Sequence, residues 1–181
     1  MKNQTNIEKL ITSGKRVFTT GDLAVLWEIN DRRKLIERIK HYLRNGRLTH
    51  VYKGVYAYGN FSSLEVAQKL VPLSYISLYT AAQMHGLTFQ NYSTVFCISL
   101  KSKRYSLGEQ AYEYHRVKET IFYNTLGLEK GSGYLVAGKE RTICDLMYVY
   151  PRFAFDNLKQ VDISLLKQIS LIYNNKRLER T

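Results

Sequence analysis

The sequence predicts an α+β protein, in which helical and β-rich segments are largely segregated along the chain. Capped helical segments fill most of the first 45 residues and recur later, whereas β-rich segments gather between residues 95 and 137. Polar loops rather than regular helices separate the β-rich segments, so a doubly wound parallel sheet is not expected. The chain has 181 residues, 45% of them hydrophobic and 23% charged, and this usage excludes disorder of the whole chain.

Two short helices are expected at the N-terminus. The capping boxes Thr5-x-x-Glu8 and Thr19-x-x-Asp22 open them, because each Thr hydroxyl can accept an otherwise unpaired amide hydrogen and each acidic side chain can reach back. Gly14 can adopt the left-handed conformation that closes the first helix. The residues expected to face inward are Ile7, Leu10 and Ile11 in the first helix and Leu23, Leu26 and Trp27 in the second.

A third helix is predicted to begin after Asn30 or Asp31 and to run to about Arg44, with Asn45-Gly46 as its stop. At about 100° per residue, five apolar residues fall on one side of this helix. They are Leu35, Ile36, Ile39, Tyr42 and Leu43. The opposite side is mostly basic and carries Arg33, Lys34, Glu37, Lys40, His41 and Arg44, with Arg38 on the flank. The apolar stripe is therefore expected to dock the helix, and the cationic stripe to face solvent.

Residues 47–58 are β-rich on both sides of Gly54, with Lys53 at the tip, and are expected to form a hairpin. Three short helices followed by a two-stranded ribbon is the order of a winged helix-turn-helix, in which the ribbon is the wing. We therefore expect such a domain over residues 1–60, with a boundary at Gly59-Asn60, and a mixed α/β domain over residues 61–181.

The charge of the chain points to a polyanion as a partner. There are 27 Lys and Arg against 15 Asp and Glu, a net +12. The stretch from Arg32 to Arg47 alone holds seven basic residues and one acidic residue. Because the major groove of DNA admits one α-helix, Arg and Lys on the third helix could read guanine or hold phosphates. The predicted DNA-binding residues are Arg32, Arg33, Lys34, Lys40, His41 and Arg44 on the helix and Lys53 on the wing.

Glu37 is the one acidic residue on the predicted DNA-facing side. It could accept a hydrogen bond from cytosine N4, or it could pair with Arg33 or His41 one turn away. The pairing within the helix is favoured. The alternative for the whole stripe is a solvated helix face, which the helix order, the caps and the ribbon argue against.

The rest of the chain is expected to contain four helices and four strands. The helices are Ser62 to Leu70, opened by Ser62-x-x-Glu65 and ended by Pro72, then Ser74–His85 with Gly86 as its stop, Lys139–Tyr148, and Asp162 to about Tyr173. The strands are Val95–Leu100, Ala111–Val117, Thr120–Tyr123 and Tyr134–Ala137.

Three further groups of charged residues could face a partner. Lys101, Lys103 and Arg104 form a basic loop between two expected strands, and Lys176-Arg177 belongs to a basic tail. Each could be a second contact with a polyanion, could meet an acidic partner, or could be an ordinary solvated surface. Arg141 and Asp145 could form a partner-facing or active-site pair, although an i, i+4 contact that orders the start of their helix is favoured.

No catalytic, metal or cofactor site is expected. The four histidines are scattered and none has a second ligand three or four residues away, and Gly131-Ser132-Gly133 lacks the pattern of a phosphate-binding loop. Glu113 and Lys118 lack the compact spacing of a nuclease motif. Cys97 and Cys144 lie in apolar runs and are expected to be buried thiols in a reducing cytoplasm. The longest apolar runs are too short to span a membrane, and no signal peptide is expected.

Four segments together resemble AbiEi-family antitoxins. They are Gly46-Arg47-Leu48 with Tyr52-Lys53-Gly54-Val55-Tyr56, the segment Tyr75–Leu87 ending in His-Gly-Leu, Glu140-Arg141-Thr142-Ile143-Cys144-Asp145-Leu146, and Tyr173-Asn174-Asn175-Lys176-Arg177. In order, these segments cover nearly the whole chain. It is their order and spacing that carry the resemblance.

The resemblance implies a prokaryotic two-gene toxin–antitoxin locus. The winged helix would bind inverted repeats in the promoter and repress the operon, and the C-terminal domain would counteract an AbiEii-like nucleotidyltransferase toxin, with or without binding it directly. The chain stops soon after Lys176-Arg177, where some relatives continue, so reduced antitoxin activity or a purely regulatory role is also open. Two rival functions remain. One is a stand-alone regulator whose C-terminal domain senses a ligand or dimerises, and the other is a nucleic-acid-processing enzyme.

Overall fold

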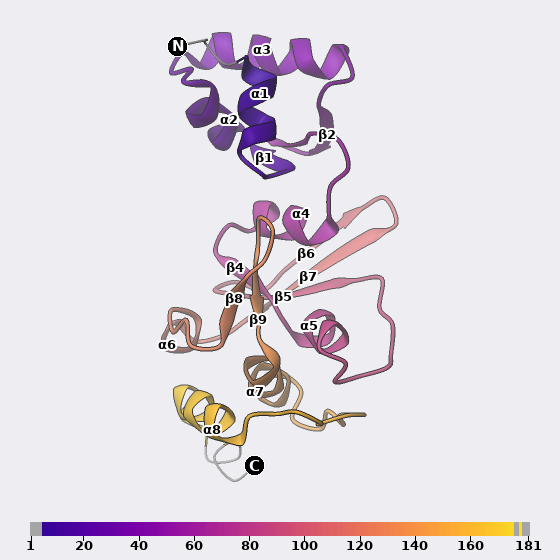
Figure 1. Ribbon diagram of the computed structural model, residues 1–181, viewed down its shortest axis with the longest axis vertical. Coiled ribbons are helices and arrows are strands. Elements are labelled where there is room, and N and C mark those ends of the chain that lie inside the picture. The colour runs from indigo at the N-terminus through magenta and orange to yellow at the C-terminus, as the bar shows by residue number, and fades with distance from the viewer. Residues whose placement is uncertain (1–4, 176–177, 179–181) are drawn as a thin grey trace. The chain divides into compact units, whose positions relative to one another are not determined.

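The computed structural model describes residues 5–175 and residue 178. The chain folds into two compact units, of which the first ends at Leu70 and the second begins at Val71 (Figure 1). Each unit contains both helices and a β-sheet, so the expected mixture of the two is confirmed.

Among residues 5–70, the first unit forms four helices and three short strands (Figure 1). In chain order they are α1 (Asn6–Thr12), β1 (Val17–Thr19), α2 (Thr20–Trp27), α3 (Arg32–Arg44), β2 (Thr49–Tyr52), β3 (Val55–Ala57) and α4 (Ser63–Leu70). Both predicted capping boxes form, at Thr5 for α1 and at Thr19 for α2. Asp31 is the N-cap of α3, since its carboxylate accepts a hydrogen bond from the amide of Lys34 at 3.0 Å.

The predicted hairpin is the antiparallel pair β2 and β3. A third strand, β1, pairs with the other edge of β3 and gives the order β1-β3-β2. The sequence did not predict β1, because three residues between two helix signals show no period of their own. The sheet therefore joins the segment before α2 to the segment after α3.

The core of the first unit lies between these helices and the sheet. It is formed by Leu10, Phe18, Leu23, Trp27, Leu35, Ile39, Leu48 and Tyr56. The expectation that Ile11 faces inward is wrong, because half of its surface is exposed. On a helix as short as α1, Leu10 alone is fully buried.

Helix α4 belongs to the first unit, so the division of the chain lies one helix later than the expected boundary at Gly59-Asn60. The Glu65 carboxylate is buried and accepts hydrogen bonds from the amides of Arg16 and Val17, at 3.1 and 2.9 Å. Lys69 forms an ion pair with Asp22 at 2.7 Å. Glu65 thus joins α4 to β1, while the Ser62 hydroxyl caps α4 through the amide of Leu64 at 3.1 Å.

The second unit is built on a mixed six-stranded sheet of order β6-β7-β5-β4-β9-β8. Its elements are β4 (Ser74–Ile76), α5 (Leu78–Met84), β5 (Val95–Ser99), β6 (Lys103–Leu107), β7 (Gln110–Arg116), α6 (Glu119–Phe122), β8 (Leu128–Lys130), β9 (Leu135–Ala137), α7 (Lys139–Val149) and α8 (Ile163–Ile172). The pairs β5 with β7 and β4 with β9 are parallel, and the other pairs are antiparallel.

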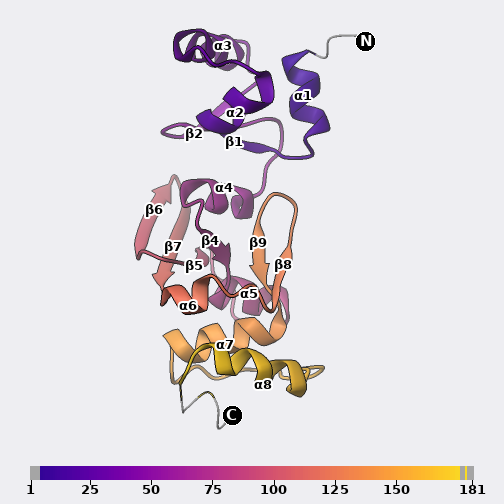
Figure 2. The ribbon, with the colours of Figure 1, turned by 90° about the vertical axis from the view of Figure 1, so that its left-hand side faces the viewer.

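Helix α7 lies between two other helices of the second unit. Helix α7 contacts α5, β9 and α8, and α5 contacts β5. Figure 2 shows α7 and α8 side by side, beneath the sheet. Cys97 on β5 and Cys144 on α7 are buried free thiols, as predicted.

Three secondary-structure predictions in this unit are wrong. Ser74–Ile76 is a strand rather than the start of a helix, and Thr120–Phe122 lies in the short helix α6 rather than in a strand. The predicted basic loop continues into an edge strand, because Lys103 and Arg104 begin β6. In each case the partner is distant in sequence or the segment is only a few residues long, and local preference then decides little.

Candidate nucleic-acid interface

Helix α3 is held in place by its apolar stripe. Leu35 and Ile39 are buried in the core of the first unit, and the Tyr42 ring packs against that of Trp27 with centroids 5.3 Å apart. Gly46 adopts a positive φ of 64° directly after the end of α3, where the sequence predicts the stop of this helix. The helix is therefore fixed to the unit by one side only.

The other side of α3 is exposed and cationic. All seven of its basic residues lie on the solvent-facing surface: Arg32, Arg33, Lys34, Arg38, Lys40, His41 and Arg44. Glu37 forms the predicted i, i+4 ion pair with Arg33, at 3.5 Å. The Asn45 amide lies 3.1 Å from Nε2 of His41. Since Glu37 is the one acidic side chain on this surface, the face is strongly favourable for an anion.

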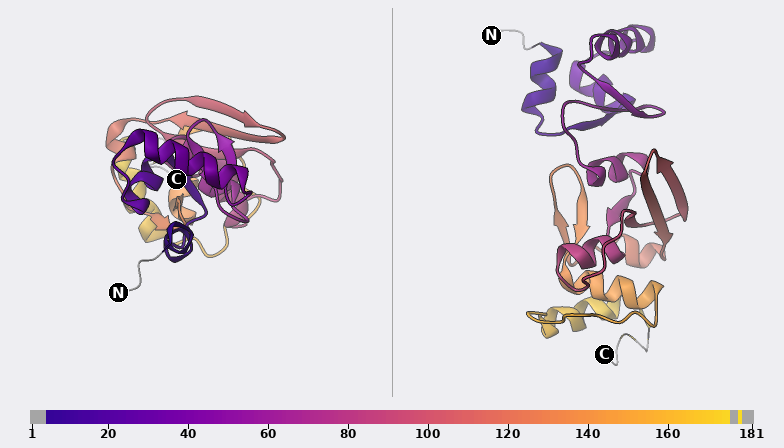
Figure 3. Two further views of the ribbon diagram at one scale, coloured as in Figure 1. Left: turned by 90° about the horizontal axis from the view of Figure 1, so that it is seen from above. Right: turned by 90° about the vertical axis from the view of Figure 1, so that its right-hand side faces the viewer.

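The β2–β3 turn is fixed to the start of α2. The amide of Thr20 donates a hydrogen bond to the carbonyl of Gly54 at 2.9 Å, and the Thr20 hydroxyl lies 3.4 Å from the same oxygen. Gly54 has a positive φ of 73°, which a glycine adopts without strain. Lys53 at this turn is exposed. Figure 3 (right) shows the hairpin projecting on the same side of the unit as α3.

The connection from α2 to α3 is a tight four-residue turn, from Glu28 to Asp31. Glu28 is in the left-handed conformation with φ 58°, and its carboxylate pairs with Lys9 of α1 at 2.8 Å. This hydrogen bond with Lys9 lowers the pKa of Glu28. Asp31 then caps α3, and the hydrogen bond from the Lys34 amide lowers the pKa of its carboxyl. The turn thus sets the angle at which α3 leaves α2.

Arg47 is exposed beside this surface but is absent from the predicted DNA-binding set. Its amide donates to the carbonyl of Tyr42 at 2.9 Å, so its backbone is fixed directly after the helix. The signal that could have identified it is its place at the end of the basic stretch that begins at Arg32. The structure therefore brings the predicted helix residues together, and adds Arg38 and Arg47 to them.

No protein-family model and no curated protein matches this chain. Inferences about its function therefore rest on the geometry of its own residues. Within residues 5–175 and 178, no group of three or more His, Cys, Asp or Glu side chains is arranged to hold a metal ion. In the same part of the chain, no helix is long and apolar enough to cross a membrane.

The basic residues of the second unit that were predicted to face a partner differ in exposure and in pairing. Lys101, Lys103 and Arg104 are exposed, and Arg104 pairs with Glu113 of the neighbouring strand at 2.9 Å. This pair raises the pKa of Arg104 and neutralises part of the basic strand. Lys176 and Arg177 lie outside the described residues.

Arg141 does not face a partner, because its side chain is completely buried. Its Nη1 donates to the carbonyls of Asn124 and Leu126, both at 3.1 Å, and its Nη2 donates to the carbonyl of Ile121 at 2.7 Å. The guanidinium also lies 5.5 Å from the ring centroids of both Tyr75 and Tyr173. Arg141 therefore fastens the α6–β8 loop to α7 from inside the unit.

The partner of Arg141 is Asp145, which is also completely buried. Nε of Arg141 lies 3.8 Å from Oδ1 of Asp145, which is the i, i+4 contact favoured by the sequence. Asp145 accepts hydrogen bonds from the hydroxyls of Tyr75, Ser77 and Tyr173, at 3.1, 2.7 and 2.7 Å. The network therefore joins β4, α7 and the residue after α8.

The electrostatics of this network keep it intact. Burial raises the pKa of Asp145, and the charge of Arg141 with the three hydroxyl donors opposes that rise. Burial also raises the pKa of Tyr75 and of Tyr173, so both phenols remain protonated donors. Because a buried charge is costly unless it is paired and hydrogen-bonded, Arg141 and Asp145 depend on these contacts to remain buried.

Proposed function

We propose that the first unit is a winged helix-turn-helix domain that binds double-stranded DNA. In this proposal α3 enters the major groove and the Lys53–Gly54 turn contacts the adjacent backbone. The observation that carries it is the cationic, solvent-facing side of α3, beside a hairpin that projects on the same side of the unit (Figure 3). The order of helices, the four-residue turn and the following hairpin agree with this domain type.

The experiment compares two charge-matched double variants of the full chain. Arg33→Ala with Lys40→Ala removes two cations from α3. We expect the affinity for a labelled promoter duplex to fall on the order of tenfold or more, and the slope of log K against log salt to flatten by up to about 1.8, since each lost phosphate contact removes about 0.9. Fluorescence anisotropy at several salt concentrations measures both quantities.

The control is Lys15→Ala with Arg16→Ala, which removes the same charge from the segment between α1 and β1. We expect this variant to lose little affinity for DNA. Salt screens the attraction between the DNA and charges that lie far from it, but it screens a direct contact with a phosphate much less. Equal losses in the two double variants would place α3 outside the interface.

We also infer that the protein is an AbiEi-like antitoxin that represses its own operon, with the second unit supplying antitoxicity. Supporting this, Tyr75, Arg141, Asp145 and Tyr173 come from three of the segments that carry the resemblance, and they meet in one buried network. A cognate nucleotidyltransferase toxin encoded beside the gene is the partner that this function requires.

The antitoxin function is tested by co-expression with the neighbouring nucleotidyltransferase. A fragment that begins at Val71 should restore growth, and a fragment that ends at Leu70 should not. Rescue by the shorter N-terminal fragment alone would refute this division of labour. Co-purification of the full chain with the toxin then distinguishes direct binding from an indirect effect.

The second candidate is a stand-alone regulator whose second unit senses a ligand. The observation that favours it is an open aromatic groove in that unit, lined by residues from three segments of the chain. The absence of a neighbouring nucleotidyltransferase gene would favour this function over the antitoxin.

A further inference from the structure

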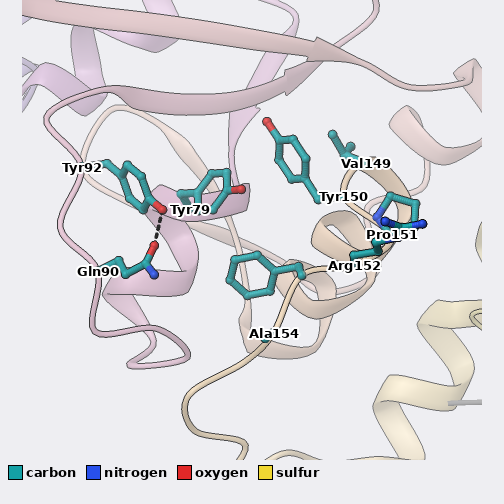
Figure 4. A pocket seen from close by; sticks show the side chains of 9 residues that line it. Tyr79, Gln90, Tyr92, Val149, Tyr150, Pro151, Arg152 and Ala154 are labelled. Atoms are coloured by element: carbon teal, nitrogen blue, oxygen red, sulfur yellow. Dashed lines mark hydrogen bonds between the residues drawn. The ribbon is translucent and has the colours of Figure 1, made fainter.

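The second unit has an open groove of about 580 Å³, a size typical of ligand sites. Three segments line it: Tyr79 of α5, Gln90 and Tyr92 of the loop before β5, and residues 149–154, which begin with the last residue of α7. Figure 4 shows Gln90 and Tyr92 at one end, Tyr79 and Tyr150 in the middle, and Pro151 and Arg152 at the other end. The buried Arg141–Asp145 network is not part of this lining.

Four of the nine residues that line the groove are aromatic: Tyr79, Tyr92, Tyr150 and Phe153. The ring centroid of Tyr79 lies 4.7 Å from that of Tyr92, 5.1 Å from that of Tyr150 and 5.5 Å from that of Phe153. Tyr92 is 39% exposed, so part of this aromatic surface faces solvent. Aromatic side chains that line a groove are the usual platform for a stacked planar ring.

The charge of the groove is positive. Arg152 is the one charged residue among the nine that line it, and none of the nine is acidic. The Arg152 side chain is exposed, and its guanidinium makes no ion pair or hydrogen bond with any residue that the structure describes. A guanidinium available in this way is suited to a phosphate, which it can bind through two parallel hydrogen bonds.

Hydrogen bonds join two of the segments that line the groove. Oδ2 of Asp156 accepts from the Thr88 hydroxyl at 3.1 Å and from the amide of Phe89 at 2.8 Å. The amide of Asp156 donates to the carbonyl of Leu87 at 3.0 Å. The segment after α7 is thereby tied to the segment before β5, and the groove exists without a ligand to shape it.

The position of Tyr150 is also fixed. Its hydroxyl lies 3.1 Å from Nε2 of His115, which is 3.0 Å from Oε1 of Glu113. Burial lowers the pKa of His115, while the neighbouring Glu113 carboxylate opposes this shift. One wall of the groove is therefore held by the sheet.

We propose that this groove binds one nucleotide, with the nucleobase stacked on Tyr79 and Tyr92 and the phosphate on Arg152. A purely apolar ligand would need an enclosed cavity, and a proline-rich peptide, which also docks on aromatic grooves, needs no cation at the end of its site. A ligand with a planar ring and an anionic group can contact both the aromatic side chains and the guanidinium of Arg152. This site is separate from the DNA interface on α3 and does not depend on it.

The test is a calorimetric titration of the full chain with AMP, adenosine and inorganic phosphate. AMP should bind, adenosine should bind about tenfold more weakly, and phosphate alone should not bind measurably. Tyr92→Ala, at the exposed rim, should weaken AMP and adenosine alike by about tenfold, since one stacking surface is lost. Arg152→Ala should weaken AMP about tenfold and leave adenosine within about twofold.

Lys101→Ala removes an exposed cation of the same unit outside the groove and serves as the matched control, with AMP affinity unchanged. Titration with a tetranucleotide tests whether the natural ligand is a free nucleotide or one nucleotide of a strand. If the ligand is a free nucleotide, the tetranucleotide should bind as tightly as AMP, and if it is part of a strand, the tetranucleotide should bind more tightly. AMP binding that survives both groove substitutions, or no AMP binding by the wild-type chain, would overturn the proposal. Binding of a polyproline peptide in place of AMP would also overturn it.

Discussion

Asp145→Ala is expected to lower the free energy of unfolding of the second unit by about 3–5 kcal/mol, the cost of breaking a buried ion pair by removing one partner. The substitution leaves the Arg141 charge in the interior with no counter-charge, and it removes the acceptor of the Tyr75, Ser77 and Tyr173 hydroxyls. Chemical denaturation followed by circular dichroism measures the change. DNA binding by the full chain should persist, because the first unit does not contain this network.

The control for this prediction removes both charges at once. The double variant Arg141→Met with Asp145→Leu should be clearly more stable than Asp145→Ala, because hydrophobic side chains of similar volume leave no buried charge. A double variant that is no more stable than the single one would show that the carbonyl contacts of Arg141, and not its charge balance, hold the unit together.

Glu65→Ala is expected to destabilise the first unit by about 2–4 kcal/mol, since a buried amide left without its acceptor costs about 1–3 kcal/mol. One carboxylate oxygen, Oε2, accepts both the Arg16 and the Val17 amides, so a single substitution leaves two donors unsatisfied. Thermal unfolding of the full chain, with DNA binding as a second readout, measures the loss.

Glu65→Gln is the matched control. Its amide oxygen can still accept both hydrogen bonds, so we expect a loss of only about 1 kcal/mol, which reflects the missing charge. If Glu65→Ala were as stable as the wild-type chain, α4 would not be an integral part of the first unit.

The N-terminal helices and the hairpin could be predicted because their signals are local. A capping box at Thr5 or Thr19 needs only residues within one turn, and the apolar stripe of α3 is a period within thirteen residues. The same period predicted which basic side chains of α3 are exposed. The exposure of the cationic side of α3 could therefore be predicted, with Arg38 on its flank, whereas DNA binding by this surface stays a prediction.

The second unit was harder to predict because its partners are distant in sequence. Ser74–Ile76 is a strand because Ile76 pairs with Cys97 on one side and Val136 on the other. Nothing in the three residues themselves distinguishes this strand from the first turn of a helix. Glu65 in the first unit was also hard to predict. Its spacing from Ser62 indicates a capping box, whereas its carboxylate accepts a hydrogen bond from the amide of Val17, which is distant in sequence.

Arg141 illustrates why site residues were missed or misplaced. A sequence shows an arginine at the start of a helix, and arginine is usually exposed. It does not show that Tyr75 and Tyr173, at distant positions, supply hydroxyls and aromatic faces around the guanidinium. The aromatic groove could not be predicted from the sequence for the same reason, because its three lining segments are separated by up to seventy residues of chain.

The pairing of β4 with β9 has a consequence for how the chain folds during its synthesis. All strand partners of the first unit have left the ribosome soon after Leu70 has, so that unit can fold while the rest is still being made. Ile76, in contrast, cannot meet Val136 until about sixty more residues have been added, which takes about 3–12 s at typical bacterial and eukaryotic rates of translation. During that interval β4 can pair with β5, whose residues are made soon after it, but the edge of β4 that later pairs with β9 has no partner strand.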